Sequence, residues 1–258
     1  MSEASTDQSN PQFIATLEKG IRVLEMFRSG HASLGLTELA EHCAMTKSAA
    51  QRFTYTWCEL GYLQKDERSR RYSLTHKALE LGFLYLNSDP LISKVLPALT
   101  RIRERCSLTV NLSLLSGHDI VYVMRIPGAQ QTVIEMLPGR RMPAWCTSAG
   151  RMLLAALPDE RIRDSLAANP LEAFTPHTQV DPEMLFQHIV QARQQGYALA
   201  SEQVLIGQIG VAAPIRNLHL QTVAAVNITA QLNQWPEQRM VEELVPLLME
   251  TTQSLLVG

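Results

Sequence analysis

The chain has 258 residues, 46% of them hydrophobic, and a formal net charge of −2. This length suits two compact domains better than one very large domain, and the composition can fill a core in each. The net charge excludes a protein that coats nucleic acid through overall basicity, but it leaves room for a local basic surface. No apolar run follows a basic start, and no segment reaches the roughly 18 uninterrupted apolar residues of a membrane span, so we expect a cytoplasmic protein without a membrane partner.

The cysteines give no sign of a metal site or a redox couple. There are four of them, far apart in the sequence and without a C-x-x-C pair. Structural zinc sites and redox couples need cysteines at short spacing. We therefore expect reduced, packed thiols, no bound metal and no cofactor. The cysteines are Cys43, Cys58, Cys106 and Cys146.

The N-terminal part predicts a flexible tail followed by three helices. Residues 1–11 are polar and lack periodicity, so they cannot bury enough surface to become ordered. Apolar residues then recur at three- and four-residue steps, and Gly30 ends the first helix. Thr37 and Thr46 are the expected N-caps of the second and third helices, which a tight corner at Ala44 separates. The expected helices span residues 14–27, 37–43 and 46–60.

A hairpin and a linker follow the three helices. Residues 62–64 and 71–74 alternate in polarity and flank a charged loop, which predicts a small β-hairpin, or wing. Helical spacing returns from Thr75 to Leu86, and Asp89-Pro90 breaks it. We expect this helix to join two domains.

The remainder mixes strand and helix periods and predicts one α+β domain with an antiparallel sheet. The expected helices are 91–106, 148–157, 181–196 and one opened by Pro236, and the expected strands are 109–115, 120–126, 132–136, 197–199, 210–215 and 223–230. The predicted organisation is a tail (1–11), a winged helix-turn-helix domain (12–75), a linker helix (76–89) and an α+β domain (90–258).

The second and third helices have the spacing of a helix-turn-helix. Apolar or small residues occupy the positions that pack across the turn, and the exposed face of the third helix carries hydrogen-bonding side chains that can reach base edges or phosphates. Residues 12–77 hold 10 basic and 7 acidic residues, against 13 and 16 from residue 78 onward. The alternative is a packing or dimerisation module with solvated charges, and the basic wing argues against it. The expected DNA-binding residues are Thr46, Lys47, Ser48, Gln51, Arg52, Thr54, Tyr55, Arg68, Arg70 and Arg71, with Lys47, Gln51 and Arg52 foremost.

Several sequence blocks stand out along the chain, namely Leu17–Leu24, Leu36–Ala40, Glu59–Leu63, Tyr72–Thr75, Arg141–Ala155, Gly196-Tyr197, Gly207 and Val211–Ile215. Together these blocks resemble the IclR-type transcriptional regulators, and the resemblance covers nearly everything after Phe13. Two positions depart from that pattern, because Ala44 stands where glycine is common and the turn 217–221 lacks the usual glycine. The resemblance implies a GAF/PAS-like effector domain that binds a small organic acid, assembly as a dimer or a dimer of dimers, and a palindromic double-stranded DNA operator.

The effector pocket of that family, transferred position by position, falls on Met142, Ser148, Ala149, Ser201, Gln208, Gly210, Asn227 and Thr229. The residues add their own argument. Asn227 and Thr229 are two apart on a strand, so they share a face and can hydrogen-bond either a ligand or each other. Unpaired N–H groups where a helix opens at 147–150 favour a carboxylate. Arg141 can pair with that carboxylate, or it is a solvated or interface arginine.

The block 143–151 looks most like the branch that includes protocatechuate and 4-hydroxybenzoate regulators of aromatic catabolism, so we expect an aromatic acid as effector. Two other classes stay open. A hydrolase would use Ser148 or Cys146 with His118 or His177, although no G-x-S-x-G motif is present. A ligand sensor that binds protein instead of DNA is the other. We expect ligand binding to shift the linker helix or the dimer arrangement. Activation and repression are equally open, and RNA polymerase is a partner only of an activator.

Overall fold

The computed structural model describes residues 11–129, 137–168, 170–255 and 257. The chain divides into two compact units, Met1–Leu86 and Asn87–Gly258. The predicted strand at 132–136 lies outside the described residues. Within the described ranges, no helix is long and apolar enough to cross a membrane.

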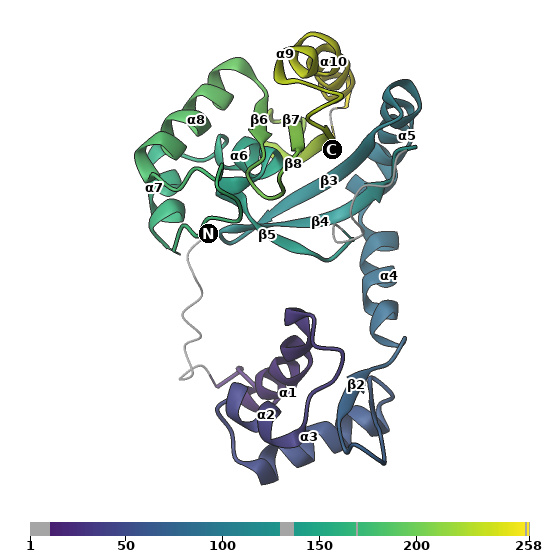
Figure 1. The fold of residues 1–258 in the computed structure, drawn as a ribbon. Coiled ribbons are helices and arrows are strands. Elements are labelled where there is room, and N and C mark those ends of the chain that lie inside the picture. Colours follow the sequence, from purple (N-terminus) through teal and green to yellow (C-terminus); the bar gives the residue numbers. More distant parts are fainter. Residues whose placement is uncertain (1–10, 130–136, 169, 256, 258) are drawn as a thin grey trace. The chain divides into compact units, whose positions relative to one another are not determined.

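The first unit contains three helices and a hairpin (Figure 1). The hairpin strands pair antiparallel, with Leu63 opposite Leu74 and Lys65 opposite Tyr72. Leu34 extends the hairpin, because it exchanges two backbone hydrogen bonds with Tyr72. The elements are α1 (Ala15–Glu25), the 3-10 turn η1 (Met26–Ser29), α2 (Leu36–His42), α3 (Lys47–Glu59), β1 (Leu63–Lys65) and β2 (Tyr72–Leu74).

Two details of the helix-turn-helix differ from or refine the sequence analysis. Thr37 is not the N-cap of α2: the helix begins one residue earlier, after Gly35, because the Glu38 carboxylate reaches back to accept the Gly35 N–H. Ala44 has a φ of +51°, in the left-handed region, which explains why glycine is common at this corner. The core of the unit gathers Val23, Phe27, Leu34, Leu39, Cys43, Leu63 and Tyr72.

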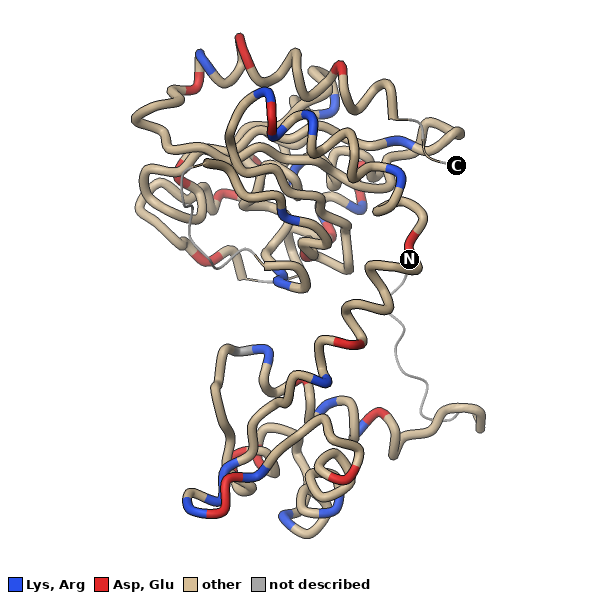
Figure 2. The backbone as a smooth tube through the Cα atoms, turned by 90° about the vertical axis from the view of Figure 1, so that its right-hand side faces the viewer, with Lys and Arg blue, Asp and Glu red and all other residues tan. Residues whose placement is uncertain are grey.

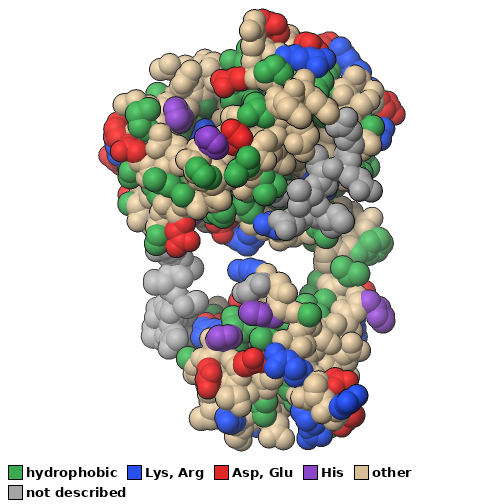
Figure 3. Space-filling model, in the orientation of Figure 1, with side chains coloured by type: hydrophobic (Ala, Val, Ile, Leu, Met, Phe, Trp, Pro, Cys, Tyr) green, Lys and Arg blue, Asp and Glu red, His purple; other side chains and the backbone are tan. Residues whose placement is uncertain are grey.

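The linker region forms helix α4 (Ala78–Ser88), and the division between the two units falls within it. None of its residues is buried against the described part of the chain. Its surface is apolar nonetheless, with Leu79 75% and Leu84 61% exposed, and Figure 3 shows hydrophobic side chains over it.

The second unit is built on a six-stranded antiparallel sheet in the order β5-β4-β3-β8-β7-β6. The predicted hairpin is confirmed: β3 and β4 pair around Gly117, which has a φ of +64°. The other predicted strands within the described residues also form, with ends that differ by one or two residues, and β5 was not predicted. The strands are β3 (Thr109–Ser116), β4 (Asp119–Ile126), β5 (Arg141–Pro143), β6 (Ala198–Ser201), β7 (Gln208–Arg216) and β8 (Thr222–Gln231).

Helices cover both faces of this sheet (Figure 1). On one face, α6 packs on β7, β8 and β3, and α7 and α8 complete a core with it. On the other face, α5 packs on β3 and β4, and α10 packs on β7. Helix α7 was not predicted. The helical elements are α5 (Pro90–Cys106), the 3-10 turn η2 (Ala144–Cys146), α6 (Ser148–Leu154), α7 (Asp159–Ala167), α8 (Pro182–Gln195), α9 (Glu237–Arg239), the π-turn η3 (Met240–Leu244) and α10 (Val245–Ser254).

Candidate DNA interface and effector cavity

Helix α3 presents most of the predicted DNA-contacting side chains to solvent. Thr46 caps it, with Oγ1 accepting the Ala49 N–H at 3.2 Å. Lys47, Gln51 and Arg52 are exposed. So are Ser48 and Tyr55.

Thr54 is a correction to the predicted contact surface. Its side chain is fully buried, and its hydroxyl donates to the carbonyls of Ala50 and Gln51 within the helix. Thr54 lies one position after Phe53, on the side of α3 that faces the core, so it cannot reach DNA.

The wing arginines divide into two kinds. Arg71 is engaged within the protein: its guanidinium donates to Ser33 Oγ, to the Ser33 carbonyl and, at 2.9 Å, to Glu38 Oε2. It therefore ties the wing to the start of α2. Arg70 lies at the loop, 68% exposed and with a φ of +59°, and makes only a long contact of 3.4 Å to Glu67. Arg68 is exposed as well.

The wing loop is preorganised and carries charges of both signs (Figure 2). Asp66 Oδ1 accepts hydrogen bonds from both the backbone N–H and the hydroxyl of Ser69, each at 2.6 Å, and these bonds lower the pKa of Asp66. Lys65 lies over the Tyr72 ring, 5.6 Å from its centroid. A fixed loop presents its arginines to a phosphate backbone at a low cost in conformational entropy.

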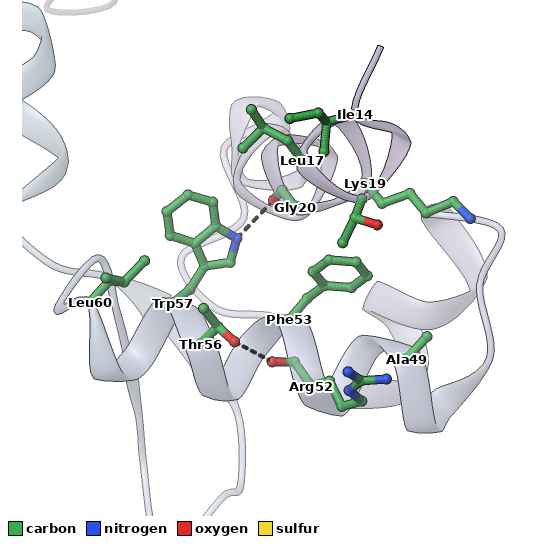
Figure 4. A pocket seen from close by; sticks show the side chains of 11 residues that line it. Ile14, Leu17, Lys19, Gly20, Ala49, Arg52, Phe53, Thr56, Trp57 and Leu60 are labelled. Atoms are coloured by element: carbon green, nitrogen blue, oxygen red, sulfur yellow. Dashed lines mark hydrogen bonds between the residues drawn. The ribbon is translucent and has the colours of Figure 1, made fainter. Parts of the chain in front are cut away.

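An open, largely apolar groove of about 750 Å³ lies between α1 and α3 (Figure 4). The Trp57 indole spans it and donates to the Gly20 carbonyl at 2.8 Å. Leu17 of α1 is 59% exposed beside it. Arg52 also lines the groove, so this predicted DNA-binding residue borders the apolar surface.

The second unit contains a polar cavity between α6 and the sheet. Five of the predicted effector residues meet there. Position 210 is crowded, because a Cβ there would lie only 3.0 Å from Ser148 Oγ. The lining includes the predicted Ser148, Gln208, Gly210, Asn227 and Thr229, together with Tyr122 and Gln203, which the sequence analysis missed.

Buried polar atoms without hydrogen-bond partners mark this face of the sheet. Among the described residues they include Asn111 Oδ1, Ser113 Oγ and Asn227 Oδ1. Asn111 lies directly opposite Asn227 in the β3–β8 ladder, so both point to the same face. Ser113 is two residues further along β3 on that face. Buried polar groups are normally hydrogen-bonded, so these three atoms leave hydrogen-bonding capacity that a polar ligand or a bound water can satisfy.

Asn227 and Thr229 also bond to each other, with Asn227 Nδ2 donating to Thr229 Oγ1 at 3.0 Å. The two side chains therefore hydrogen-bond each other, which was the alternative to ligand binding. Asn227 can still accept a further hydrogen bond, because its Oδ1 atom has no partner among the described residues. The cavity itself measures about 40 Å³, close to the volume of one water molecule, about 30 Å³ in the liquid. An organic acid therefore requires the walls to move, and Val204 and Gln203 in the loop after β6 form the least regular wall.

Four predicted effector residues do not line this cavity. Arg141 binds the β3–β4 turn, with Nε 3.1 Å from Asp119 Oδ2 and Nη2 donating to the Ser116 carbonyl. Met142 and Ala149 are buried in the apolar core against the helices. Ser201 lines a neighbouring cavity.

The candidate hydrolase residues are not assembled into a catalytic pair. Burial raises the pKa of the Cys146 thiol to about 12, so the thiolate is scarce at neutral pH. The histidines contact other residues: His118 Nδ1 lies 3.2 Å from Ser165 Oγ, and His177 Nε2 lies 3.7 Å from Glu202.

A winged helix-turn-helix followed by an α+β unit with a polar cavity defines the class of ligand-responsive DNA-binding proteins. Comparison with known families agrees: the IclR helix-turn-helix domain matches residues 16–67, and the bacterial transcriptional regulator IclR C-terminal domain matches residues 83–256. The chain belongs to the IclR family of bacterial transcriptional regulators, which bears out the resemblance.

The relatives are regulators rather than enzymes. The chain is 32% identical to the Pca regulon regulatory protein of Pseudomonas putida (95% of this chain, 84% of that protein) and 32% identical to the p-hydroxybenzoate hydroxylase transcriptional activator of Acinetobacter baylyi (98% and 94%). A transcriptional regulator from Rhodococcus sp. RHA1 has the same fold over 93% of this chain and 96% of its own, with a TM-score of 0.80 and 31% identity. A mutant inducer-binding domain of PobR from Acinetobacter, in complex with 3-hydroxybenzoic acid, matches 62% of this chain and 94% of its own at 30% identity, with a TM-score of 0.57.

Proposed function

We propose that this regulator responds to a hydroxylated aromatic acid, acts in the cytoplasm and controls an operon for aromatic catabolism. The observation that supports the ligand is the row of buried, unsatisfied polar atoms on β3 and β8, one of which, Asn227 Oδ1, belongs to a residue that lines the cavity together with Ser148. A carboxylate accepts hydrogen bonds and a phenolic hydroxyl both donates and accepts, so such an acid satisfies a mixed set of hydroxyl and amide groups. The relatives named for p-hydroxybenzoate hydroxylase and for the Pca regulon support the same class.

The residues proposed to contact the acid are Ser148, Gln208, Gly210, Asn227 and Thr229, joined by Asn111, Ser113 and Tyr122. Asn227 is the best single test, because it lines the cavity and keeps an unsatisfied oxygen. Arg141 is not among the proposed contacts, since its guanidinium already donates hydrogen bonds to Asp119 and to the Ser116 carbonyl.

Calorimetry tests the ligand class. We expect the full chain to bind 4-hydroxybenzoate or protocatechuate and Asn227→Leu to lose about tenfold or more in affinity, since a buried hydrogen bond to a charged or polar ligand contributes about 1.5–3 kcal/mol. The matched control is Asn233→Leu, at an exposed position outside the cavity. Tight binding of an aliphatic acid, with no binding of either aromatic acid, would contradict the proposal.

For DNA, we propose that α3 enters the major groove and the wing contacts the backbone. Lys47, Gln51 and Arg52 contact bases or their flanking phosphates, and Thr46, Ser48 and Tyr55 add to that surface. Arg68 and Arg70 contact phosphates. Arg71 shapes the wing from within, so it is not part of the proposed interface.

Gel-shift titration against salt measures these contacts. Operator affinity should fall steeply with salt, because each phosphate contact releases counterions. Arg52→Ala should lower discrimination between operator and unrelated DNA, by about 1–3 kcal/mol for a base contact, whereas Arg70→Ala should weaken all sequences alike and reduce the salt slope by about one. If neither variant changes binding, the assignment of α3 and the wing is wrong.

We further propose that the chain self-associates, as a dimer or a dimer of dimers, with α4 as linker helix between a DNA-binding domain (12–75) and an effector-binding domain (90–258). The apolar, unburied surface of α4 supports this, because an exposed patch of this kind usually marks an interaction site. A symmetric dimer matches a palindromic operator. RNA polymerase is a partner if the protein activates transcription.

A further inference from the structure

A second cavity, of about 280 Å³, lies in the second unit apart from the proposed effector site. Elements α6, α8 and β6 supply most of its wall, and α9 adds one residue. Its polar lining includes Arg151, His188, Gln191 and Tyr197. Only Gln203 lines both this cavity and the effector cavity.

Arg151 is a buried cation without a carboxylate partner. Its side chain is inside the protein, at 6% exposure, and it forms no ion pair with any described residue. It donates only to neutral acceptors: the carbonyls of Trp145 and Leu199, each at 3.0 Å, and Gln203 Oε1 at 2.9 Å. A guanidinium has five N–H groups, so these bonds leave part of its capacity and all of its charge uncompensated.

His188 is a second polar group without a partner on the same cavity. Its Nδ1 atom is buried and forms no hydrogen bond within the described structure. Burial and, to a smaller extent, the charge of Arg151 lower the pKa of His188, so the neutral imidazole is favoured. A negative ion placed beside both groups would offset the contribution of Arg151, whereas the contribution of burial would remain.

We propose that this cavity is a second ligand site, which takes a small organic monocarboxylate. The cavity suits a small ligand, since its volume of about 280 Å³ is below the range of about 300–1,000 Å³ typical of pockets for drug-sized ligands. One negative charge balances the one uncompensated guanidinium. A dianion would meet repulsion from Glu237, an exposed carboxylate on the wall of the cavity.

Benzoate is the probe for this proposal, and the ring signals of His188 are the local reporter. The full chain is titrated with benzoate by NMR, with His188 assigned from the signal that His188→Gln lacks. We expect a saturable shift and a rise in the pKa of His188, because the anion stabilises the imidazolium. The other charged or titratable groups on the cavity wall are Arg151, Tyr197 and Glu237.

Glu237→Gln distinguishes this site from any other benzoate site. Removing the like charge should tighten the binding that His188 reports by about threefold to tenfold. Glu242→Gln, at an exposed position outside the cavity, should leave it unchanged. The variant Arg151→Lys, which keeps the charge but loses the fork of donors, should weaken it.

The proposal is overturned if His188 shows no saturable shift up to about 10 mM benzoate, a concentration that corresponds to very weak binding. It is also overturned if Glu237→Gln and Glu242→Gln have equal affinities. A further variant separates this cavity from the effector cavity. Asn227→Leu should leave the benzoate titration of His188 unchanged even where it abolishes binding at the effector cavity.

Discussion

At the scale of single residues, Ala44 has a left-handed backbone at a position where glycine is common in the family, and this predicts a measurable effect on stability. An alanine in the left-handed region destabilises the folded state by about 1–2 kcal/mol. Glycine avoids this strain but gives the unfolded chain more conformational entropy, so Ala44→Gly recovers only part of that free energy. We expect Ala44→Gly to stabilise the first unit by up to about 1 kcal/mol in urea unfolding, followed by the fluorescence of Trp57 in a background where Trp145 and Trp235 are replaced by Phe. A variant that is clearly less stable would show that the corner is held by packing of the methyl group instead.

The scale of structural elements is where the sequence predicted most and where its limits are clearest. Periodicity located α1, α3 and nearly every described strand, because a buried face imposes a period of 3.6 or 2 on the residues that form it. It missed α7, whose Asp159–Ala167 segment is mostly charged and buries only three residues. The prediction also placed Thr54 on the wrong face of α3. The sequence does not distinguish a threonine whose hydroxyl bonds within its own helix from one that faces solvent.

For the effector site too, the sequence predicted residues that share one strand but not contacts between segments far apart in the chain. Asn227 and Thr229 were identifiable from their spacing on one strand. Asn111 and Ser113 carry the same alternation on β3, a signal that was present but unused. The pairing of β3 with β8 could not be predicted from the sequence pattern, because it joins residues more than a hundred positions apart. The occupation of Arg141 by Asp119 and Ser116 likewise depends on tertiary geometry.

The wing gives a prediction at this scale. Arg71 links β2 to Ser33 and Glu38, so Arg71→Ala should lower the thermal stability of the first unit by about 1 kcal/mol, the typical size of partly exposed hydrogen bonds and ion pairs. Arg68→Ala, at an exposed position of the same loop, should leave the melting temperature unchanged while weakening DNA binding. Scanning calorimetry and gel shift on the two variants separate them, and equal melting temperatures would rule out the structural role of Arg71.

At the scale of the whole molecule, the apolar surface of α4 supports the proposed self-association. Leu79, Leu81 and Leu84 are 75%, 54% and 61% exposed, and water-exposed leucines on one helix gain about 1.5–3 kcal/mol each when fully buried. In the proposed dimer, a second copy would bury these side chains and set two recognition helices on one operator, which would couple dimerisation to DNA binding. We therefore expect Leu84→Glu to shift the protein toward monomer in sedimentation equilibrium and to reduce operator affinity by about tenfold or more, since a charge must be desolvated at the interface. Glu80→Lys is the matched control, because it changes charge on the same helix at an exposed, already polar position. A dimer that survives Leu84→Glu with full operator affinity would place the self-association surface elsewhere, and the α1–α3 groove that contains Leu17 and Trp57 would be the next surface to test.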